Sequence, residues 1–197
     1  MFTAKTFSLP ALEGISEKNI SEHLKLYEGY VRGANFCYET VQELRKDYDE
    51  NAYLIGELTR RFSFEFNGMR NHECYFGNFE NGSETFDETS LLGQKIIETF
   101  GSYQNFVTIV TQTALTRGIG WVFLSHDTEN EELLIHWVDE QHIGQLGGIT
   151  PLIALDMWEH AFVYDYPTSE KKKYIEAFFK NLNWKTIENR YSHTKNK

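Results

Sequence analysis

Apolar residues at helical spacing mark the first part of the chain. The segment from residue 16 to residue 48 is charged and contains no proline. Its apolar positions fall three or four residues apart, at Ile20, Leu24, Tyr27 and Val31. This spacing predicts one long helix or the first arm of a helical hairpin. Ser16 is the expected N-cap, and Asn19 stands three residues later, where a full capping box has Glu or Gln.

A second helical arm is predicted from residue 52 to residue 76, although a glycine at position 68 is unfavourable inside a helix. We expect the two arms to pair antiparallel. The next segment, "FENGSETFDETS" at residues 79–90, is rich in Gly, Ser, Asn and acidic residues, which is typical of a linker. We therefore predict two domains, a helical hairpin at residues 1–85 and a second domain at residues 86–197.

The second domain begins with helical patterning and then changes character. "GWVFLSH" at residues 120–126 and "ELLIHWV" at residues 132–138 are rich in aromatic and β-favouring residues, and "DTENE" between them supplies turn chemistry. They predict a β-hairpin, with a third strand at residues 151–156. From Trp158 onward the pattern is helical again. The expected fold class is α+β, with the N-terminal pair of helical arms followed by an α+β domain.

Composition and charge narrow the class of protein. The chain has 197 residues, of which 41% are hydrophobic, and this is ample for a core. No apolar run approaches the roughly 18 residues of a membrane span, and no signal peptide is apparent. The formal net charge of −10 opposes binding to nucleic acid or to an anionic membrane. Two cysteines, Cys37 and Cys74, are not a disulfide scaffold, so we expect a soluble cytoplasmic protein.

The candidate chemistry rests on histidines and carboxylates. The sequence has no Gly-rich phosphate loop, CxxC, GxSxG or HExxH motif. Asp156 and His160 form the strongest pair, four residues apart in "LDMWEHAF". If the third strand ends at Asp156, its carboxylate leaves a buried apolar run and needs a cation or strong donors. His23 on the first helix and His72 on the second are further candidates.

Three imidazoles and one carboxylate together would form an N3O donor set. Such a set suits iron or manganese, leaves room for a bound water, and is compatible with zinc. Each member also has an ordinary structural explanation: a solvent-edge imidazole for His23, a partly buried one for His72, and a local contact for the Asp156–His160 pair. The residues alone thus indicate a mononuclear metal site and no particular reaction.

Three segments carry a resemblance to a known family. "DMWEHAF" resembles the signature D-x-W-E-H-A-[YF], "GIGWVFL" resembles G-S-G-W-V-W-L, and "FNGMRNH" resembles F-N-x-x-x-N-H. The signatures belong to the iron/manganese superoxide dismutases, and they occur here in that family's order. The resemblance covers nearly the whole chain. It implies a three-stranded antiparallel sheet in the second domain, one Fe or Mn ion per subunit between the domains, and a homodimer or a dimer of dimers.

The resemblance also implies roles for individual residues. The metal ligands would be His23, His72, Asp156 and His160. The other site residues would be the gateway Tyr30, the wall residues Trp121 and Trp158, and Glu159, which would reach His160 of a neighbouring subunit. The implied activity is dismutation, in which two superoxide anions and two protons give dioxygen and hydrogen peroxide while the ion alternates between its trivalent and divalent states.

The first helix departs from the family pattern. "HLKLYEGYV" is one residue shorter than the family's H-x-x-K-H-H-x-x-Y-V, so without a local gap Glu22 would face the metal. We prefer His23, because its imidazole keeps the ligand set intact. The family's second histidine on this helix is Leu26 or Tyr27 here, and its partner across the dimer is Val163. The paired replacement suggests a rewired substrate gateway, and it leaves an alternative function open, a non-catalytic metal-binding or assembly relative.

The hydrogen-bond donor to the metal-bound water has two candidates. Iron-type members use a glutamine four residues before the second histidine ligand, but this position is Gly68 here, as in manganese-type members. The segment "VDEQHIGQLGG" after the sheet hairpin supplies Gln141 and His142, and we slightly favour His142. The glycine favours manganese, but a histidine donor could adjust the reduction potential of either metal. Both iron and manganese therefore stay open.

Overall fold

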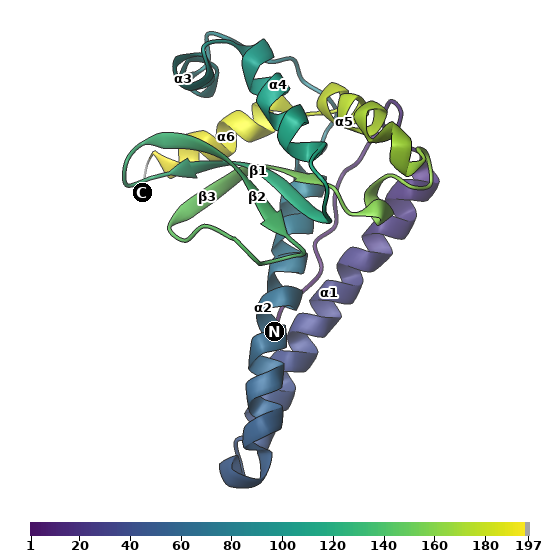
Figure 1. Ribbon diagram of the computed structural model, residues 1–197, viewed down its shortest axis with the longest axis vertical. Helices are drawn as coiled ribbons and strands as arrows, with labels where there is room; N and C mark the ends of the chain where they lie inside the picture. The colour runs from purple at the N-terminus through teal and green to yellow at the C-terminus, as the bar shows by residue number, and fades with distance from the viewer. Residues whose placement is uncertain (196–197) are drawn as a thin grey trace.

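Two long antiparallel helices form the N-terminal part of the chain. The computed structural model describes residues 1–195, in which α1 (Glu17–Leu44) and α2 (Tyr48–Gly77) lie side by side and project from the rest as a hairpin (Figure 1). Side-chain caps fix both helix starts, because Ser16 Oγ accepts from Asn19 N–H at 3.1 Å and Asp47 Oδ1 accepts from Glu50 N–H at 3.2 Å. The cap at Asp47 begins the second arm four residues earlier than we predicted, and Gly68 does not interrupt it.

The second part is built on a small antiparallel sheet. β1 (Gly120–Asp127) lies between β2 (Glu132–Asp139) and β3 (Ile149–Asp156), so the order is β2-β1-β3. The expected α+β class and three-stranded antiparallel sheet are therefore confirmed. β3 begins two residues earlier than predicted. At Gly120 a Cβ would lie 2.1 Å from the Val138 carbonyl oxygen, so only glycine allows the close approach of β1 and β2.

Short helices surround the sheet at the end opposite the free tip of the hairpin (Figure 1). They are α3 (Leu91–Phe100), α4 (Tyr103–Ala114), α5 (Lys171–Lys180) and α6 (Trp184–Thr194), with 3₁₀ turns at Glu159–Ala161 and Thr168–Glu170. The helical patterning after the linker therefore resolves into two helices. Gly101 ends α3 with a left-handed φ of 84°, and Ser102 caps α4.

The predicted linker at residues 79–90 is fastened to the C-terminal helices. Asn183 Nδ2 donates to the carbonyl oxygens of Glu80 and Gly82 at 2.9 and 2.7 Å, and Glu84 N–H donates to Leu182 O at 3.1 Å. The segment separates α2 from α3, as the prediction required. The division into two domains near residue 85 stays a prediction.

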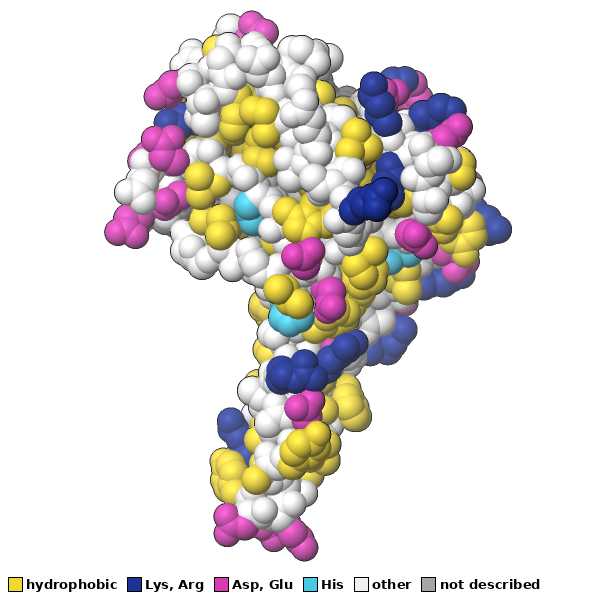
Figure 2. Space-filling model, viewed as in Figure 1, with side chains coloured by type: hydrophobic (Ala, Val, Ile, Leu, Met, Phe, Trp, Pro, Cys, Tyr) yellow, Lys and Arg dark blue, Asp and Glu magenta, His cyan; other side chains and the backbone are white. Residues whose placement is uncertain are grey.

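The surface carries both signs of charge, and hydrophobic side chains are also visible along the projecting hairpin (Figure 2). Phe36, Tyr38 and Tyr53 are among the exposed aromatic residues of the hairpin. No helix within residues 1–195 combines the length and the hydrophobicity needed to cross a lipid bilayer.

Asn78, which caps the C-terminus of α2, joins three elements of the core. Its side chain is fully buried, donates from Nδ2 to Ala154 O of β3 at 3.1 Å, and accepts at Oδ1 from Arg190 Nη1 of α6 at 2.7 Å. Arg190 Nη1 also donates to Leu152 O at 2.7 Å. This amide therefore holds a guanidinium group against the sheet.

We predict that Asn78→Leu lowers the free energy of unfolding by about 3 kcal/mol, because it leaves a buried carbonyl and part of a guanidinium group without partners. Urea denaturation followed by circular dichroism measures the change. Gln112→Leu, at an exposed position of α4, is the control and is expected to stay within about 0.5 kcal/mol of the parent protein. Equal midpoints for the two variants would contradict this role of Asn78.

Candidate metal centre

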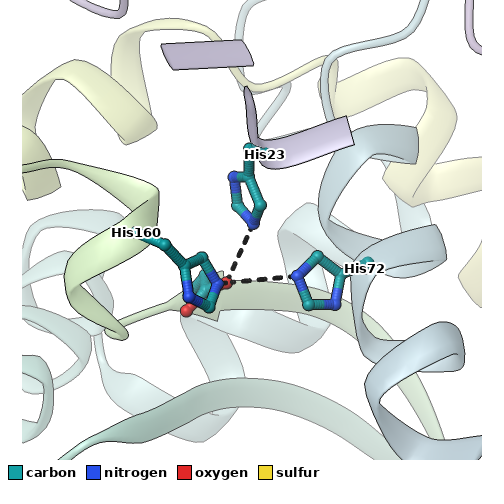
Figure 3. A group of neighbouring side chains, drawn as sticks. His23, His72 and His160 are labelled. Atoms are coloured by element: carbon teal, nitrogen blue, oxygen red, sulfur yellow. Dashed lines mark hydrogen bonds and ion pairs between the residues drawn. The ribbon is translucent and has the colours of Figure 1, made fainter. Parts of the chain in front are cut away.

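Four side chains from both parts of the chain converge at one buried point. His23 comes from α1, His72 from α2, Asp156 from the end of β3, and His160 from the 3₁₀ turn that follows. One donor atom from each lies within 4.8 Å of the other three. Figure 3 shows the three imidazoles arranged around a shared centre. The structure thus brings together the four residues for which the sequence suggested a metal site.

Local structure explains how Asp156 and His160 reach the same point. Asp156 pairs with Trp121 at the end of the β1–β3 ladder, where its carboxylate leaves the buried strand. Its Oδ1 accepts from Trp158 N–H at 2.8 Å, which closes the turn after the strand. Its Oδ2 faces the cluster. The carboxylate therefore caps the turn with one oxygen and offers the other to the site.

Distances within the cluster are short. Asp156 Oδ2 lies 3.1 Å from His23 Nε2, 3.1 Å from His160 Nε2 and 3.8 Å from His72 Nε2. The side chains of His23, His72 and Asp156 are fully buried, whereas that of His160 is 20% exposed. The only partial opening among the four donors is therefore at His160.

The first helix places His23, and not Glu22, in this cluster. Glu22 accepts a hydrogen bond from Lys25 at 2.7 Å, and its side chain is 39% exposed. The adjacent position on a helix points about 100° away. The local adjustment that our alignment of His23 assumed is consistent with this geometry.

His72 presents an unshared electron pair to the cluster. Its Nδ1 lies 2.6 Å from the carbonyl oxygen of Gly68, which can only accept, so the ring proton is on Nδ1. Nε2 is then unprotonated, and it is buried without a hydrogen-bond partner in the described residues. Burial, followed by the charge of His23, lowers the pKa of His72 to about 3. A buried imidazole with a free electron pair at neutral pH is what a metal ligand requires.

The carboxylate supplies the negative charge of the donor set. Burial alone would raise the pKa of Asp156, but the charges and hydrogen bonds of His160 and His23 lower the pKa below the usual aspartate value. For His23, burial lowers the pKa of the imidazole. Two neutral imidazoles and an ionised carboxylate therefore face one another at neutral pH. With His160, this donor set fits a single Fe or Mn ion.

A chain of hydrogen bonds runs beside the cluster through Gln141. Trp121 Nε1 donates to Gln141 Oε1 at 2.9 Å, and Gln141 Nε2 donates to Tyr30 Oη at 3.0 Å. Gln141 is fully buried, and its backbone carbonyl accepts from Asn71 Nδ2 at 2.9 Å. The Tyr30 ring lies 5.0 Å from the His72 ring. This chain brings Gln141, Trp121 and Tyr30 to the cluster.

Gly68 makes the position of Tyr30 possible. A Cβ at this residue would lie 2.4 Å from the Tyr30 ring, so any side chain here would displace the tyrosine. A glutamine at position 68 would therefore meet Tyr30. The steric contact leaves no room for a side chain at position 68, and the amide that meets Tyr30 comes from Gln141 in another segment.

His142 lies outside this chain of hydrogen bonds. Its ring packs edge-on against Phe64, with the centroids 5.7 Å apart, and it is partly exposed. The structure brings Gln141 to Tyr30 and Trp121, although the sequence led us to favour His142 slightly. A glutamine amide can both accept and donate a hydrogen bond. This property was a signal in favour of Gln141, which accepts from Trp121 and donates to Tyr30.

The two predicted tryptophans contact imidazoles of the cluster, and Glu159 adjoins His160 in the chain. The Trp158 ring stacks on His160 at 5.8 Å, and its Nε1 donates to Glu140 O at 3.0 Å. Trp121 packs edge-on against His72 at 5.0 Å. Glu159 is exposed, next to His160. The two tryptophans therefore pack directly against imidazoles of the cluster, and Glu159 is exposed in this single chain.

Sequence reasoning missed two residues beside the ligands. Tyr75, two residues before the end of α2, is fully buried with its ring 4.9 Å from His23. Asn71 donates to the Gln141 carbonyl, as described above. Its place directly before His72 in the F-N-x-x-x-N-H segment was a signal for a role in the site. Nothing in the spacing of Tyr75 distinguished it from other core aromatic residues.

The fold and the cluster define a class of protein: a helical hairpin joined to an α+β unit, with a mononuclear site of three imidazoles and one carboxylate between them. Residues 88–190 match the profile of the iron/manganese superoxide dismutases, C-terminal domain. Over 174 residues the chain is 34% identical to superoxide dismutase [Fe] of Tetrahymena pyriformis, a match that covers 86% of this chain and 87% of the relative. The chain belongs to the iron/manganese superoxide dismutase family.

Relatives named for either metal are about equally similar. Superoxide dismutase [Mn] of Mycobacterium leprae (strain TN) is 33% identical over 177 residues, with 89% of this chain and 83% of the relative covered. Superoxide dismutase [Fe] of Mycobacterium tuberculosis (strain CDC 1551 / Oshkosh) is 34% identical over 197 residues, with 94% and 93% covered. Overall similarity therefore does not separate the two metals.

We predict that Asp156→Asn and His72→Ala each lose the ion, with a fall in affinity beyond the roughly 10–100-fold typical of losing an outer-shell partner. Protein reconstituted anaerobically with Fe or Mn and then desalted is assayed by elemental analysis. His193→Ala, at an exposed histidine of α6, is the control and is expected to keep the parent metal content. Full occupancy in folded Asp156→Asn protein would rule out this cluster as the metal site.

Proposed function

We propose that the protein is a superoxide dismutase that converts two superoxide anions and two protons into dioxygen and hydrogen peroxide. The observation that carries the proposal is the convergence of the four donor atoms of His23, His72, Asp156 and His160 within 4.8 Å in a member of this family. A bound Fe or Mn ion, held by these four residues, would supply the one-electron oxidation and reduction that the reaction needs.

The four ligands set the charge at the site. One carboxylate and three neutral imidazoles bring a single negative charge, which favours the ion in both valence states without cancelling its positive charge. The bound cation is then the largest local charge in the cleft. It opposes the overall charge of −10 where the anionic substrate must arrive.

The hydrogen bonds beside the site are arranged for proton delivery. Because Gln141 Nε2 donates to Tyr30 Oη, the tyrosine keeps its own proton free to donate. Burial, followed by the charge of Asp156, raises the pKa of Tyr30. The phenol therefore stays protonated at neutral pH. We assign Tyr30 as the group that connects the site to solvent protons and Gln141 as the donor that holds it there.

We propose that the substrate gateway is rewired relative to the familiar family pattern, as the sequence suggested. Tyr27 is buried and donates from Oη to Glu73 Oε1 at 3.3 Å, while Leu26 and Val163 are 42% and 48% exposed. We propose that the protein acts as a cytoplasmic homodimer, or a dimer of two such dimers, in which Glu159 meets His160 of the neighbouring subunit. The exposure of Glu159 and Val163 beside the partly open His160 supports this arrangement.

The first test is a stopped-flow assay of superoxide decay with protein loaded separately with Fe and with Mn. We predict catalytic decay with at least one metal and none for Asp156→Asn. His193→Ala is expected to match the parent protein. Metal-loaded parent protein that does not accelerate superoxide decay would favour the alternative function, a non-catalytic metal-binding or assembly relative.

The second test separates Gln141 from His142. We predict that Gln141→Leu lowers turnover and changes the ratio of the Fe-supported to the Mn-supported rate, with an effect of about 10–100-fold, because it removes the amide between Trp121 and Tyr30. His142→Gln is the matched control and is expected to leave that ratio unchanged. A shift in the ratio for His142→Gln alone would reverse the assignment.

A further inference from the structure

Two buried polar atoms without partners lie one helical turn apart at the start of α1. Within residues 1–195, Asn19 Oδ1 and His23 Nδ1 are both buried and accept or donate no hydrogen bond. Both residues are 0% exposed. An unmade hydrogen bond is costly for such groups, so their common location calls for an explanation.

Helix geometry places these two side chains on the same face of α1. Residues four apart share one face of a helix, and each side chain leans towards the N-terminus, over the residue four positions before it. His23 therefore leans over Asn19. In Figure 3 a dashed line joins His23 Nε2 to Asp156. The other ring nitrogen of His23, Nδ1, lies on the edge of the ring away from the cluster.

The orientation of the Asn19 amide is fixed by Asp165. Asn19 Nδ2 lies 3.1 Å from Asp165 Oδ2. A carboxylate oxygen can only accept, so the group facing it must be the NH₂ and not the carbonyl. The carbonyl oxygen of Asn19 is consequently the acceptor left for another partner.

Asp165 also explains why Asn19 is free to act in this way. In a capping box, the side chain at the third helical position accepts from the N–H of the N-cap residue. Here the N–H of Ser16, the N-cap, donates to Asp165 Oδ2 at 2.9 Å. The aspartate thus takes over the capping contact, and the Asn19 side chain, at the capping-box position, is released from it.

The ligand set of the proposed function then requires an acceptor at this place. When Nε2 of His23 binds a metal, the ring proton resides on Nδ1 and needs a partner. His72 meets the same need with the carbonyl oxygen of Gly68, four residues earlier on its helix, at 2.6 Å. For His23 the residue four positions earlier is Asn19, which offers a buried side-chain carbonyl without a partner.

We infer that Asn19 is a positioning residue of the metal centre: it is oriented by Asp165, and on metal binding it accepts a hydrogen bond from His23 Nδ1–H, a bond that is not made in the structure as described. The inference rests on the ligand set of the proposed function. The contact fixes the ring orientation and tautomer of His23, and it links the carboxylate of Asp165 to the metal through an amide and an imidazole. Outer-shell acceptors of this kind make a histidine ligand more basic and stabilise the higher valence state of the ion.

The direct test uses protein labelled with ¹⁵N-histidine and loaded with Zn²⁺, a diamagnetic ion that the same donors can bind. In the parent protein we expect the His23 Nδ1–H signal to be shifted downfield and to exchange slowly with solvent. In Asn19→Leu, which keeps the volume and removes the acceptor, the signal moves upfield or is lost to fast exchange. An unchanged His23 signal in folded Asn19→Leu protein would overturn the inference.

Metal affinity and reduction potential give a second readout. We expect Asn19→Leu to weaken metal binding by about 10–100-fold and to raise the reduction potential of the Fe-loaded or Mn-loaded protein. Asp165→Asn keeps an acceptor for Ser16 but removes the charge, so a smaller rise is expected. If the two variants leave both quantities at parent values, the inference fails.

A matched control separates this role from simple loss of a buried amide. Asn181 is 5% exposed and bonds to the backbone of Glu13 and Ala177, away from the ligands. Asn181→Leu is expected to lower the melting temperature and to leave the His23 signal and the potential unchanged. Parent protein that binds the metal but does not dismute superoxide would refute the proposed function alone, because the Nδ1–H signal does not depend on turnover.

Discussion

The buried carboxylate of Asp156 is the constraint on which the centre of this protein depends. An ionised group without solvent is costly unless charges and donors compensate it. Here one oxygen accepts from the turn that follows β3, and the other faces three imidazoles. Because two of the imidazoles come from the hairpin, the compensation also holds the hairpin against the sheet. The same group therefore joins the two parts of the fold and provides the charge that a cation needs.

Close packing around the ligands decides which polar groups can act on them. Tyr30 occupies the space that a side chain at position 68 would need. The amide beside the tyrosine must then come from the segment after β2, and Gln141 reaches the site while Asn71 holds its backbone. The contact between Tyr30 and position 68 leaves no room there for a side chain, and the amide that meets the tyrosine comes from the loop after β2. This arrangement of Tyr30, Gly68 and Gln141 involves three segments, so none of the three segments alone predicts it.

The sequence predicted the element types well, because period and turn chemistry are local properties. It missed the break between α3 and α4, since Gly101 and Ser102 interrupt an otherwise continuous helical pattern. The four clustered residues could be predicted once the motifs were considered together. Which of Gln141 and His142 meets Tyr30 could not be predicted, because the directions of adjacent loop residues depend on the packing of distant elements. Asn19 was noticed only as an incomplete capping box, and its orientation depends on Asp165, which is 146 residues away.

Selection between iron and manganese cannot rest on the four ligands alone. Divalent manganese and iron are neighbours at the weak end of the affinity order for nitrogen and oxygen sites, so the same donors bind both. What distinguishes the metals in function is the potential at which each exchanges an electron, and outer-shell hydrogen bonds adjust that potential. In this chain such bonds involve Gln141 and Tyr30 on one side and the Gly68 carbonyl behind His72 on another. The shell around the ligands, in addition to the ligands themselves, therefore bears on which metal the protein uses.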